Sequence, residues 1–302
     1  MREVKAFAEL FSKSDPKKGK NNMNQKVKYI ITGMFICAAI SFAGVSCMKV
    51  LTDRDTKYVD LNNIDLVQTK PPKEGDTTAV IKTTEGDMSF VLYPDKAPET
   101  VKHFTQLAES GYYDDTYVFN SEPGVYFSAG SHNRTGDIDE DDTVGSEEWE
   151  QELDSDLWTF KGALCSIDTG KEEGWWKRIT GSAKTLNGCR FCVMGSVDFT
   201  EDFKKELLDT DEDKTLAEAY IENGGVPAMA QKITVFGQIY DGMDVADKLM
   251  NLETRDTDEG MKIPVEDVKI KTIEIGTYKS DNAVPSTTAA SETAVTEMSE
   301  TQ

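Results

Sequence analysis

The amino-acid sequence predicts a mainly β domain in which many short strands close into a barrel capped by two helices. Residues 88–93 alternate, with Met88, Phe90 and Leu92 on one face, as a strand with one buried side requires. Residues 77–84 form a second β-rich run, and Glu85-Gly86-Asp87 between the two runs is typical of a hairpin turn. Short strands that recur with only two helices favour a closed barrel.

The first helix is expected to begin at Pro98 and to end at Gly111. Proline fits the first helical position, where its missing N–H costs nothing, and Glu99 adds a negative charge to the first turn. Apolar residues then recur at helical spacing, namely Val101, Phe104, Leu107 and Ala108. Further strands are expected at 124–130, 162–167, 190–194, 234–239 and 268–275, and the second helix at 244–250.

The N-terminal part of the chain has the pattern of a bacterial lipoprotein leader. Residues 29–46 hold no charge, follow Lys26 and Lys28, and end at Cys47 after small residues. Residues 43–47 resemble a lipobox, in which the cysteine is acylated and becomes the new N-terminus. We therefore expect a leader over 1–47, with 1–22 as an upstream extension, and a lipid-anchored domain outside the cytoplasmic membrane. A transmembrane anchor is the alternative, although the uncharged stretch is close to the minimum length for spanning.

The rest of the chain is strongly acidic. The 302 residues carry a net charge of −22, and removing 1–46 takes away eight Lys/Arg and three Asp/Glu, which leaves −27. Such a surface repels phosphate groups, so nucleic acid is excluded as a partner. We expect a flexible tether over 48–76, a folded and monomeric domain over 77–278, and a disordered Ser/Thr-rich tail over 279–302.

Three cysteines remain in the predicted domain. Cys189 and Cys192 have the spacing of a redox motif, but positions i and i+3 of a strand point to opposite faces, which disfavours a shared redox or metal site. A disulfide between Cys165 and either of them stays open.

Five short motifs, in the same order along the chain, resemble those of bacterial cyclophilins, the peptidyl-prolyl cis-trans isomerases. They lie at 94–101, 111–114, 162–164, 187–191, and 235–238 with 241–245. The resemblance covers about residues 77–277 and implies an eight-stranded antiparallel barrel with two capping helices. Two insertions depart from a minimal cyclophilin, near 168–186 and 196–230, and the second is expected to hold helices at 201–208 and 215–222. Both would lie near the family's peptide groove, and whether they cover it stays open.

The resemblance implies prolyl isomerisation without a nucleophile, metal or cofactor. Rotation of an X-Pro amide crosses a barrier of about 18–20 kcal/mol. A cyclophilin lowers this barrier with an apolar proline pocket and an arginine that donates to the prolyl nitrogen. The arginine position is Asn120 here, directly after Phe119. The other expected positions of the family's peptide groove also depart from the family's residues, and they are Phe119, Val125, Tyr126, Ser128, Cys192, Met229 and Ile233.

One substitution adds a charge instead of removing it. Arg190 occupies a position where the family has glutamine, on a strand that lines the same groove. We hypothesise that its guanidinium reaches the bound amide and partly replaces the lost arginine. A salt bridge to one of the many carboxylates at the groove edge is the alternative.

Two other patterns have simpler explanations. The carboxylates from Asp137 to Glu148 have the spacing of a calcium loop, but Asp142 stands where that loop requires glycine, so we expect a solvated acidic loop. Trp175-Trp176, in a locally basic stretch, is either a recognition element or a cap on a hydrophobic edge of the barrel.

Three functions are compatible with this reading. The first is a weakly active, lipid-anchored isomerase that assists exported proteins outside the membrane, where slow prolyl isomerisation limits folding. The second is an inactive cyclophilin barrel that binds a proline-containing segment of an exported or envelope polypeptide, and Asn120 favours it. A purely structural envelope protein, which would bind no peptide, is the third.

Overall fold

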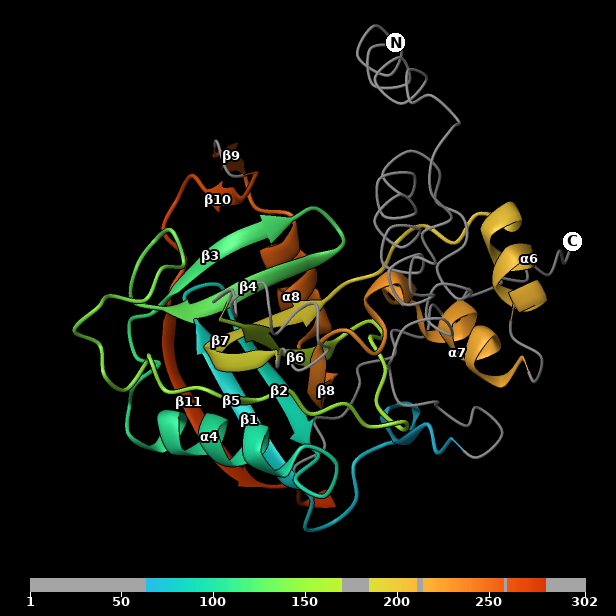
Figure 1. The fold of residues 1–302 in the computed structure, drawn as a ribbon, viewed down its shortest axis with the longest axis horizontal. Coiled ribbons are helices and arrows are strands. Elements are labelled where there is room, and N and C mark those ends of the chain that lie inside the picture. Colours follow the sequence, from blue (N-terminus) through green and yellow to red (C-terminus); the bar gives the residue numbers. More distant parts are fainter. Residues whose placement is uncertain (1–63, 170–184, 211–213, 258–259, 281–302) are drawn as a thin grey trace, which may run out of the picture. The chain divides into compact units, whose positions relative to one another are not determined.

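The computed structural model describes residues 64–169, 185–210, 214–257 and 260–280 (Figure 1). The chain divides into two units, Met1–Arg54 and Asp55–Gln302, and every described residue belongs to the second. The predicted leader with Cys47, Trp175-Trp176, most of the first insertion and nearly all of the predicted tail lie outside the described residues. Within the described part, no helix is long and apolar enough to cross a membrane.

One antiparallel sheet forms the body of the domain. Eight of its strands follow the order β11-β1-β2-β8-β6-β7-β4-β3. Their bounds are β1 (Thr77–Thr83), β2 (Asp87–Leu92), β3 (Tyr117–Glu122), β4 (Tyr126–Ser131), β6 (Ala163–Asp168), β7 (Leu186–Met194), β8 (Thr234–Asp241) and β11 (Ile270–Thr277). The short β5 (Trp149–Glu150) pairs with β7, and β9 (Thr254–Asp256) and β10 (Lys262–Pro264) form a separate hairpin. The expected mainly β, antiparallel architecture is confirmed, although β3, β5, β9 and β10 were not among the expected strands.

The two edge strands of the sheet, β11 and β3, approach each other. A single isolated bridge joins Tyr117 of β3 to Lys269, the residue directly before β11. Three backbone hydrogen bonds surround it, from Asp115 N to Ile270 O, from Ile270 N to Thr116 O and from Val118 N to Val268 O. The sheet is therefore a curved path of eight strands with a short contact between its ends, and the described strands do not form the continuous closed ladder that we expected.

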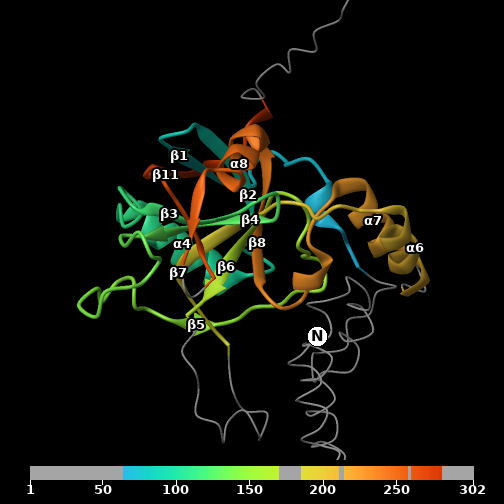
Figure 2. The same ribbon diagram turned by 90° about the horizontal axis from the view of Figure 1, so that it is seen from above.

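Two helices cover the core of this curved sheet. They are α4 (Pro98–Glu109) and α8 (Met243–Met250), as expected, and they lie at opposite ends of the sheet (Figures 1 and 2). Phe104 of α4 packs on Phe236 of β8 with ring centroids 5.0 Å apart. A distant carboxylate caps α4, because Glu152 accepts hydrogen bonds from the backbone N–H of Thr100 at 2.8 Å and from its hydroxyl at 2.7 Å.

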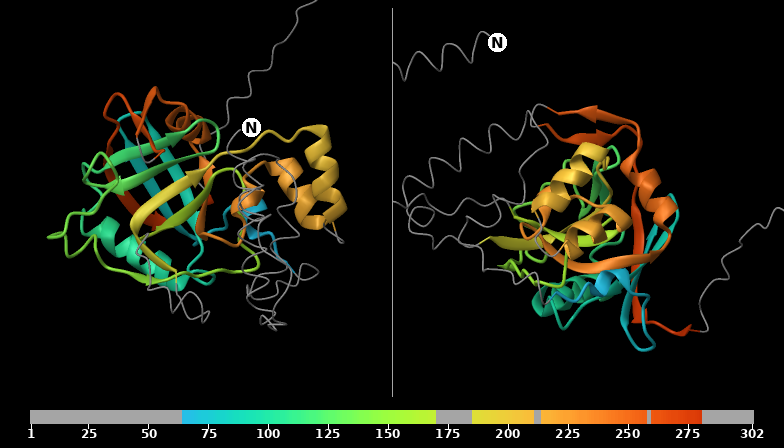
Figure 3. Two further views of the ribbon diagram at one scale, coloured as in Figure 1. Left: turned by 45° about the horizontal axis from the view of Figure 1, so that its top comes forward. Right: turned by 90° about the vertical axis from the view of Figure 1, so that its right-hand side faces the viewer.

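The second insertion forms a helical hairpin beside the sheet (gold in Figure 3). It contains α6 (Glu201–Thr210), α7 (Thr215–Asn223) and the 3-10 turn η3 (Pro227–Met229), so both expected helices are confirmed. Tyr220 anchors α7, since its hydroxyl lies 3.0 Å from Thr159 Oγ1 and its ring packs on Phe160. Gly225 then pairs with Phe160, and a Cβ at this position would lie 2.4 Å from the Thr159 carbonyl oxygen. The close approach requires glycine.

The predicted tether over 48–76 needs correction in its last part. The 3-10 turn η2 (Val67–Thr69) lies against the domain and its Gln68 is buried. The Gln68 amide donates to Gln238 Oε1 at 2.8 Å and accepts from Trp158 N at 2.6 Å. A buried amide without partners would be costly, so these two hydrogen bonds hold the segment in place. The ordered domain therefore includes residues before Thr77.

Candidate functional site

A row of side chains crosses five strands on one face of the sheet. Direct cross-strand partners run from Asn120 to Ser128, Cys192, Cys165 and Val235. Such partners point to the same face. That face is turned away from the main core, because the neighbouring residues along three of the strands belong to that core, namely Phe127, Phe191 and Phe236. The register thus brings three expected site residues side by side.

An apolar cluster covers this outer face. Cys165, Cys192 and Val235 are among its buried members. The half-buried residues packed against it include four expected groove residues, Val125, Tyr126, Met229 and Ile233. The structure therefore unites positions that lie more than a hundred residues apart in the chain. Their partial exposure leaves apolar surface at the rim that a ligand can contact.

Residues that the sequence reasoning missed enlarge the cluster. Val197 and Val226 come from the second insertion, Ile167 from β6 and Val67 from the N-terminal segment. The insertion hence packs onto the outer face, as its position near the groove suggested. No periodic pattern marks these residues, because each comes from an irregular segment or from the end of a strand.

Asn120 is buried and its side chain is engaged. Its Oδ1 accepts a hydrogen bond from the backbone N–H of Lys262 at 2.8 Å, and only 5% of the residue is exposed. Burial raises the pKa of the neighbouring Tyr126 hydroxyl, and a hydrogen bond with the Asn120 side chain opposes part of that rise. The carbonyl end of the Asn120 amide therefore already has a partner within the protein.

The hairpin β9–β10 lies along β3 and brings a cation to the margin of the row. Lys262 Nζ lies 2.9 Å from Glu122 Oε2, and Glu122 is the cross-strand partner of Tyr126. Neither Lys262 nor Glu122 belongs to the expected site. The long sequence separation between them hid this contact.

Phe119 lies apart from the apolar cluster. Its ring packs under Gly136 in the loop after β4, where a Cβ on that glycine would come within 2.5 Å of the ring. Phe119 thus supports the loop instead of lining the outer face.

Arg190 is held by two backbone carbonyls. Its Nη1 donates to Gly136 O at 2.9 Å and its Nη2 donates to Asp168 O at 3.0 Å. Among the described residues no carboxylate forms an ion pair with it, so the alternative of a groove-edge salt bridge is not found there. The guanidinium instead links the loop after β4 to the end of β6.

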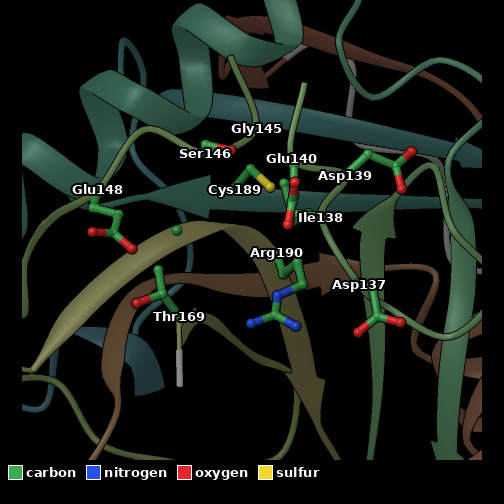
Figure 4. Close-up of a pocket in the computed structure, with 11 residues that line it drawn as sticks. Asp137, Ile138, Asp139, Glu140, Gly145, Ser146, Glu148, Thr169, Cys189 and Arg190 are labelled. Atoms are coloured by element: carbon green, nitrogen blue, oxygen red, sulfur yellow. The ribbon is translucent and has the colours of Figure 1, made fainter. Parts of the chain in front are cut away.

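An acidic cavity of about 490 Å³ lies beside Arg190 (Figure 4). Asp137, Asp139, Glu140 and Glu148 line it together with Arg190. In Figure 4 these carboxylates surround the cavity at several levels and do not converge on one point. In the described part of the chain no group of His, Cys, Asp and Glu side chains is arranged to hold a metal ion.

The three cysteines are free thiols. Cys189 belongs to the main core and Cys192 to the outer cluster, so their side chains point to opposite faces as predicted. Cys165 lies directly across from Cys192. Burial raises the pKa of the Cys165 and Cys189 thiols above the usual value, which keeps both thiols neutral and unreactive.

Sequence comparison now assigns the family. The family described as cyclophilin type peptidyl-prolyl cis-trans isomerase/CLD matches residues 78–275. The chain belongs to this family. Its order of strands and helices, and the motifs noted above, are therefore those of a cyclophilin. Most of the groove residues expected from the family resemblance lie on the outer face, in the row and in the apolar cluster.

Relatives of this cyclophilin occur in Staphylococcus and Streptococcus species. A Staphylococcus haemolyticus protein named "Putative peptidyl-prolyl cis-trans isomerase" is 30% identical over 73% of this chain and 98% of its own length. A Streptococcus pyogenes protein named "Putative bifunctional phosphatase/peptidyl-prolyl cis-trans isomerase" is 33% identical over 74% of this chain but only 42% of its own length. A cyclophilin crystal structure from Cryptosporidium parvum covers 68% of this chain and 99% of its own, with 20% identity and a TM-score of 0.48. The family assignment rests on the sequence matches.

Proposed function

We propose that this cyclophilin is a weak peptidyl-prolyl cis-trans isomerase that acts outside the cytoplasm on X-Pro bonds of exported polypeptides. The apolar cluster on the outer face carries the proposal. Tyr126, Met229 and Ile233 form a half-buried apolar rim over Cys192, at the family's groove positions. A rim of this kind suits a proline ring, which is apolar and carries no N–H to satisfy.

The weakness of the proposed activity follows from Asn120. A preorganised donor in an enclosed site accounts for about 10²–10³ in rate in other enzymes. Asparagine has no charge, and here its carbonyl oxygen already accepts a hydrogen bond from the Lys262 N–H. The remaining apolar contacts hold the proline ring while the amide twists, and they contribute only the part of the rate that depends on positioning.

The second candidate is a module that binds proline-containing segments without catalysing their cis-trans isomerisation. The engaged amide of Asn120 favours it, since a site that cannot donate to the prolyl nitrogen binds the twisted and planar amides about equally. Binding and catalysis use the same face in both candidates. The two are separated only by turnover.

The cellular setting is also part of the proposal. The uncharged stretch 29–46 and Cys47 support a lipid anchor on the outer side of the cytoplasmic membrane, and the acidic surface supports a soluble, monomeric domain there. Removal of the leader before Cys47 should reduce the size of the full chain. We expect both globomycin and the substitution Cys47→Ala to abolish this reduction. An unchanged size in both would contradict lipidation.

A turnover assay tests the isomerase proposal. The full chain is mixed with a tetrapeptide that contains a central Ala-Pro bond, and cis-trans exchange is followed by NMR. We expect exchange above the uncatalysed rate, reduced in Met229→Glu and unchanged in Met243→Glu, a control at a half-buried methionine on α8 away from the groove. Peptide binding without exchange would leave the binding module as the function.

A further inference from the structure

The groove of this cyclophilin lacks the family's arginine, yet two cations reach its outer face. Arg190 extends from β7, two residues from Cys192. Lys262 extends from β10 and lies over β3, with its backbone on Asn120 and its ammonium group on Glu122. Either of them would have to reach the bound peptide to replace the missing donor.

Arg190 is poorly placed to move. Its guanidinium donates to Gly136 O and to Asp168 O, so a turn toward the row would break two hydrogen bonds and release the loop after β4 from the end of β6. Both carbonyls would lose a charged donor at once. These contacts argue against the substitute role that we hypothesised for Arg190.

Lys262 is much freer. About a third of its side chain and a quarter of that of Glu122 are exposed, and a single ion pair joins them. The pair is part-buried but water still reaches both charges, so screening and the lost side-chain entropy limit its contribution to stability. The ammonium group has three donors on a flexible stem, so it can leave Glu122 for a nearby acceptor.

The main chain of Lys262 is held by more contacts than its side chain. The Asn120 amide accepts the Lys262 N–H at 2.8 Å, and the pairing of β10 with β9 holds the same residue opposite Asp256. Asn120 in turn contacts Tyr126, which forms part of the apolar rim. The four residues Asn120, Glu122, Tyr126 and Lys262 therefore form one connected group at the β3 margin of the groove.

We propose that Lys262 donates to the peptide group of a bound X-Pro segment in place of the family's arginine, with Asn120 as the positioning residue and Glu122 as the competing acceptor. The inference rests on the proposed isomerase function. It also assigns a role to Asn120. The Asn120 side chain stands at the arginine position and accepts the hydrogen bond that fixes the main chain of Lys262, and Lys262 carries the positive charge. No bond is made or broken in this role, since the ammonium group only stabilises the twisted amide.

The test uses two substitutions with opposite expected effects. In Lys262→Met we expect kcat/KM for the Ala-Pro tetrapeptide to fall about tenfold, less than the loss of about 10²–10³ seen for an enclosed donor. In Glu122→Gln we expect kcat/KM to rise, because the ammonium group loses its competitor. Lys262→Arg should keep most of the activity. The surface pair Lys102 and Glu99, 3.1 Å apart on α4, provides the matched controls Lys102→Met and Glu99→Gln, which should change nothing.

The outcomes separate this inference from the function on which it rests. Wild-type turnover that Lys262→Met leaves unchanged would overturn the role of Lys262 and keep the isomerase. A parallel fall in Lys262→Met and Glu122→Gln would also overturn it, because an ion pair that only stabilises the fold predicts this result. Absence of wild-type turnover would contradict both the isomerase function and the role of Lys262. Thermal unfolding of each variant shows whether a fall reflects lost structure.

Discussion

The inner and outer faces of the same sheet carry different kinds of side chain. The inner face holds closely packed aromatic residues, with Phe104 5.0 Å from Phe236 and 5.7 Å from Phe191 between ring centroids. The outer face has Asn120, Ser128 and Cys192 in one row. Because successive side chains of a strand point to opposite faces, one face can keep the fold while the other changes its chemistry. A cyclophilin fold can therefore persist while the residues on its outer face change.

The largest expected effect lies on the inner face. Replacing the buried Phe236 by alanine should lower the free energy of unfolding by about 3–5 kcal/mol, since it removes a large side chain and leaves a cavity. Val125→Ala on the outer rim should cost only about 1 kcal/mol, because that side chain already meets water. Urea unfolding measures both. Equal losses would mean that the outer face is as much a part of the core as the inner face.

A smaller effect is expected at the margin of the groove. Asn120→Ala leaves the Lys262 N–H without its acceptor, which should cost about 1–3 kcal/mol and speed hydrogen exchange of that amide. Asn251→Ala is the control, since its exposed side chain bonds to Asp247 O at the end of α8. Unchanged exchange at Lys262 would show that the hairpin β9–β10 does not depend on Asn120.

The smallest effect concerns the thiols of the two faces. Burial raises the pKa of Cys165 on the outer face and of Cys189 on the inner face. A raised folded-state pKa means that the stabilising contribution is complete below the usual thiol pKa and is lost as the pH rises above it. At pH 8 we therefore expect slow alkylation by iodoacetamide at both residues and no loss of stability, and a fall in stability above about pH 9.

Mass spectrometry of the alkylated protein reads each cysteine separately. Rapid labelling of Cys165 together with slow labelling of Cys189 would reveal that the outer face opens while the inner face stays closed. That result would sharpen the comparison, because it would show that the cluster over the groove moves aside in solution.

Much of the fold could be predicted because its signals are local. The alternation of Met88, Phe90 and Leu92 predicted β2, and Pro98 with Glu99 predicted the start of α4. The cap of α4 by Glu152 could not be predicted, since the two are brought together only by the folded chain. The same holds for Gln68, a single polar residue in a segment without periodicity.

The candidate site could also be predicted only in part. Family motifs located Asn120, Cys192 and Met229 along the chain, but only the strand register shows that Cys192 faces Cys165 and that Asn120 faces Ser128. The contact of Lys262 with Asn120 joins residues 142 positions apart and has no sequence signature. Phe119 was predicted to line the groove because it directly precedes Asn120. A bulge in the pairing of β3 with β4 lies beside Phe119, and its ring packs under Gly136 instead.

The central claim is that the outer face still binds proline-containing peptide after the loss of the arginine. A titration of the ¹⁵N-labelled full chain with the Ala-Pro tetrapeptide, followed by NMR, tests it most directly. We predict saturable shifts of the amides of Ser128, Cys192 and Ile233, together with Lys262. Shifts confined to the acidic cavity around Asp139 and Glu140, or no shifts at all at millimolar peptide, would contradict it.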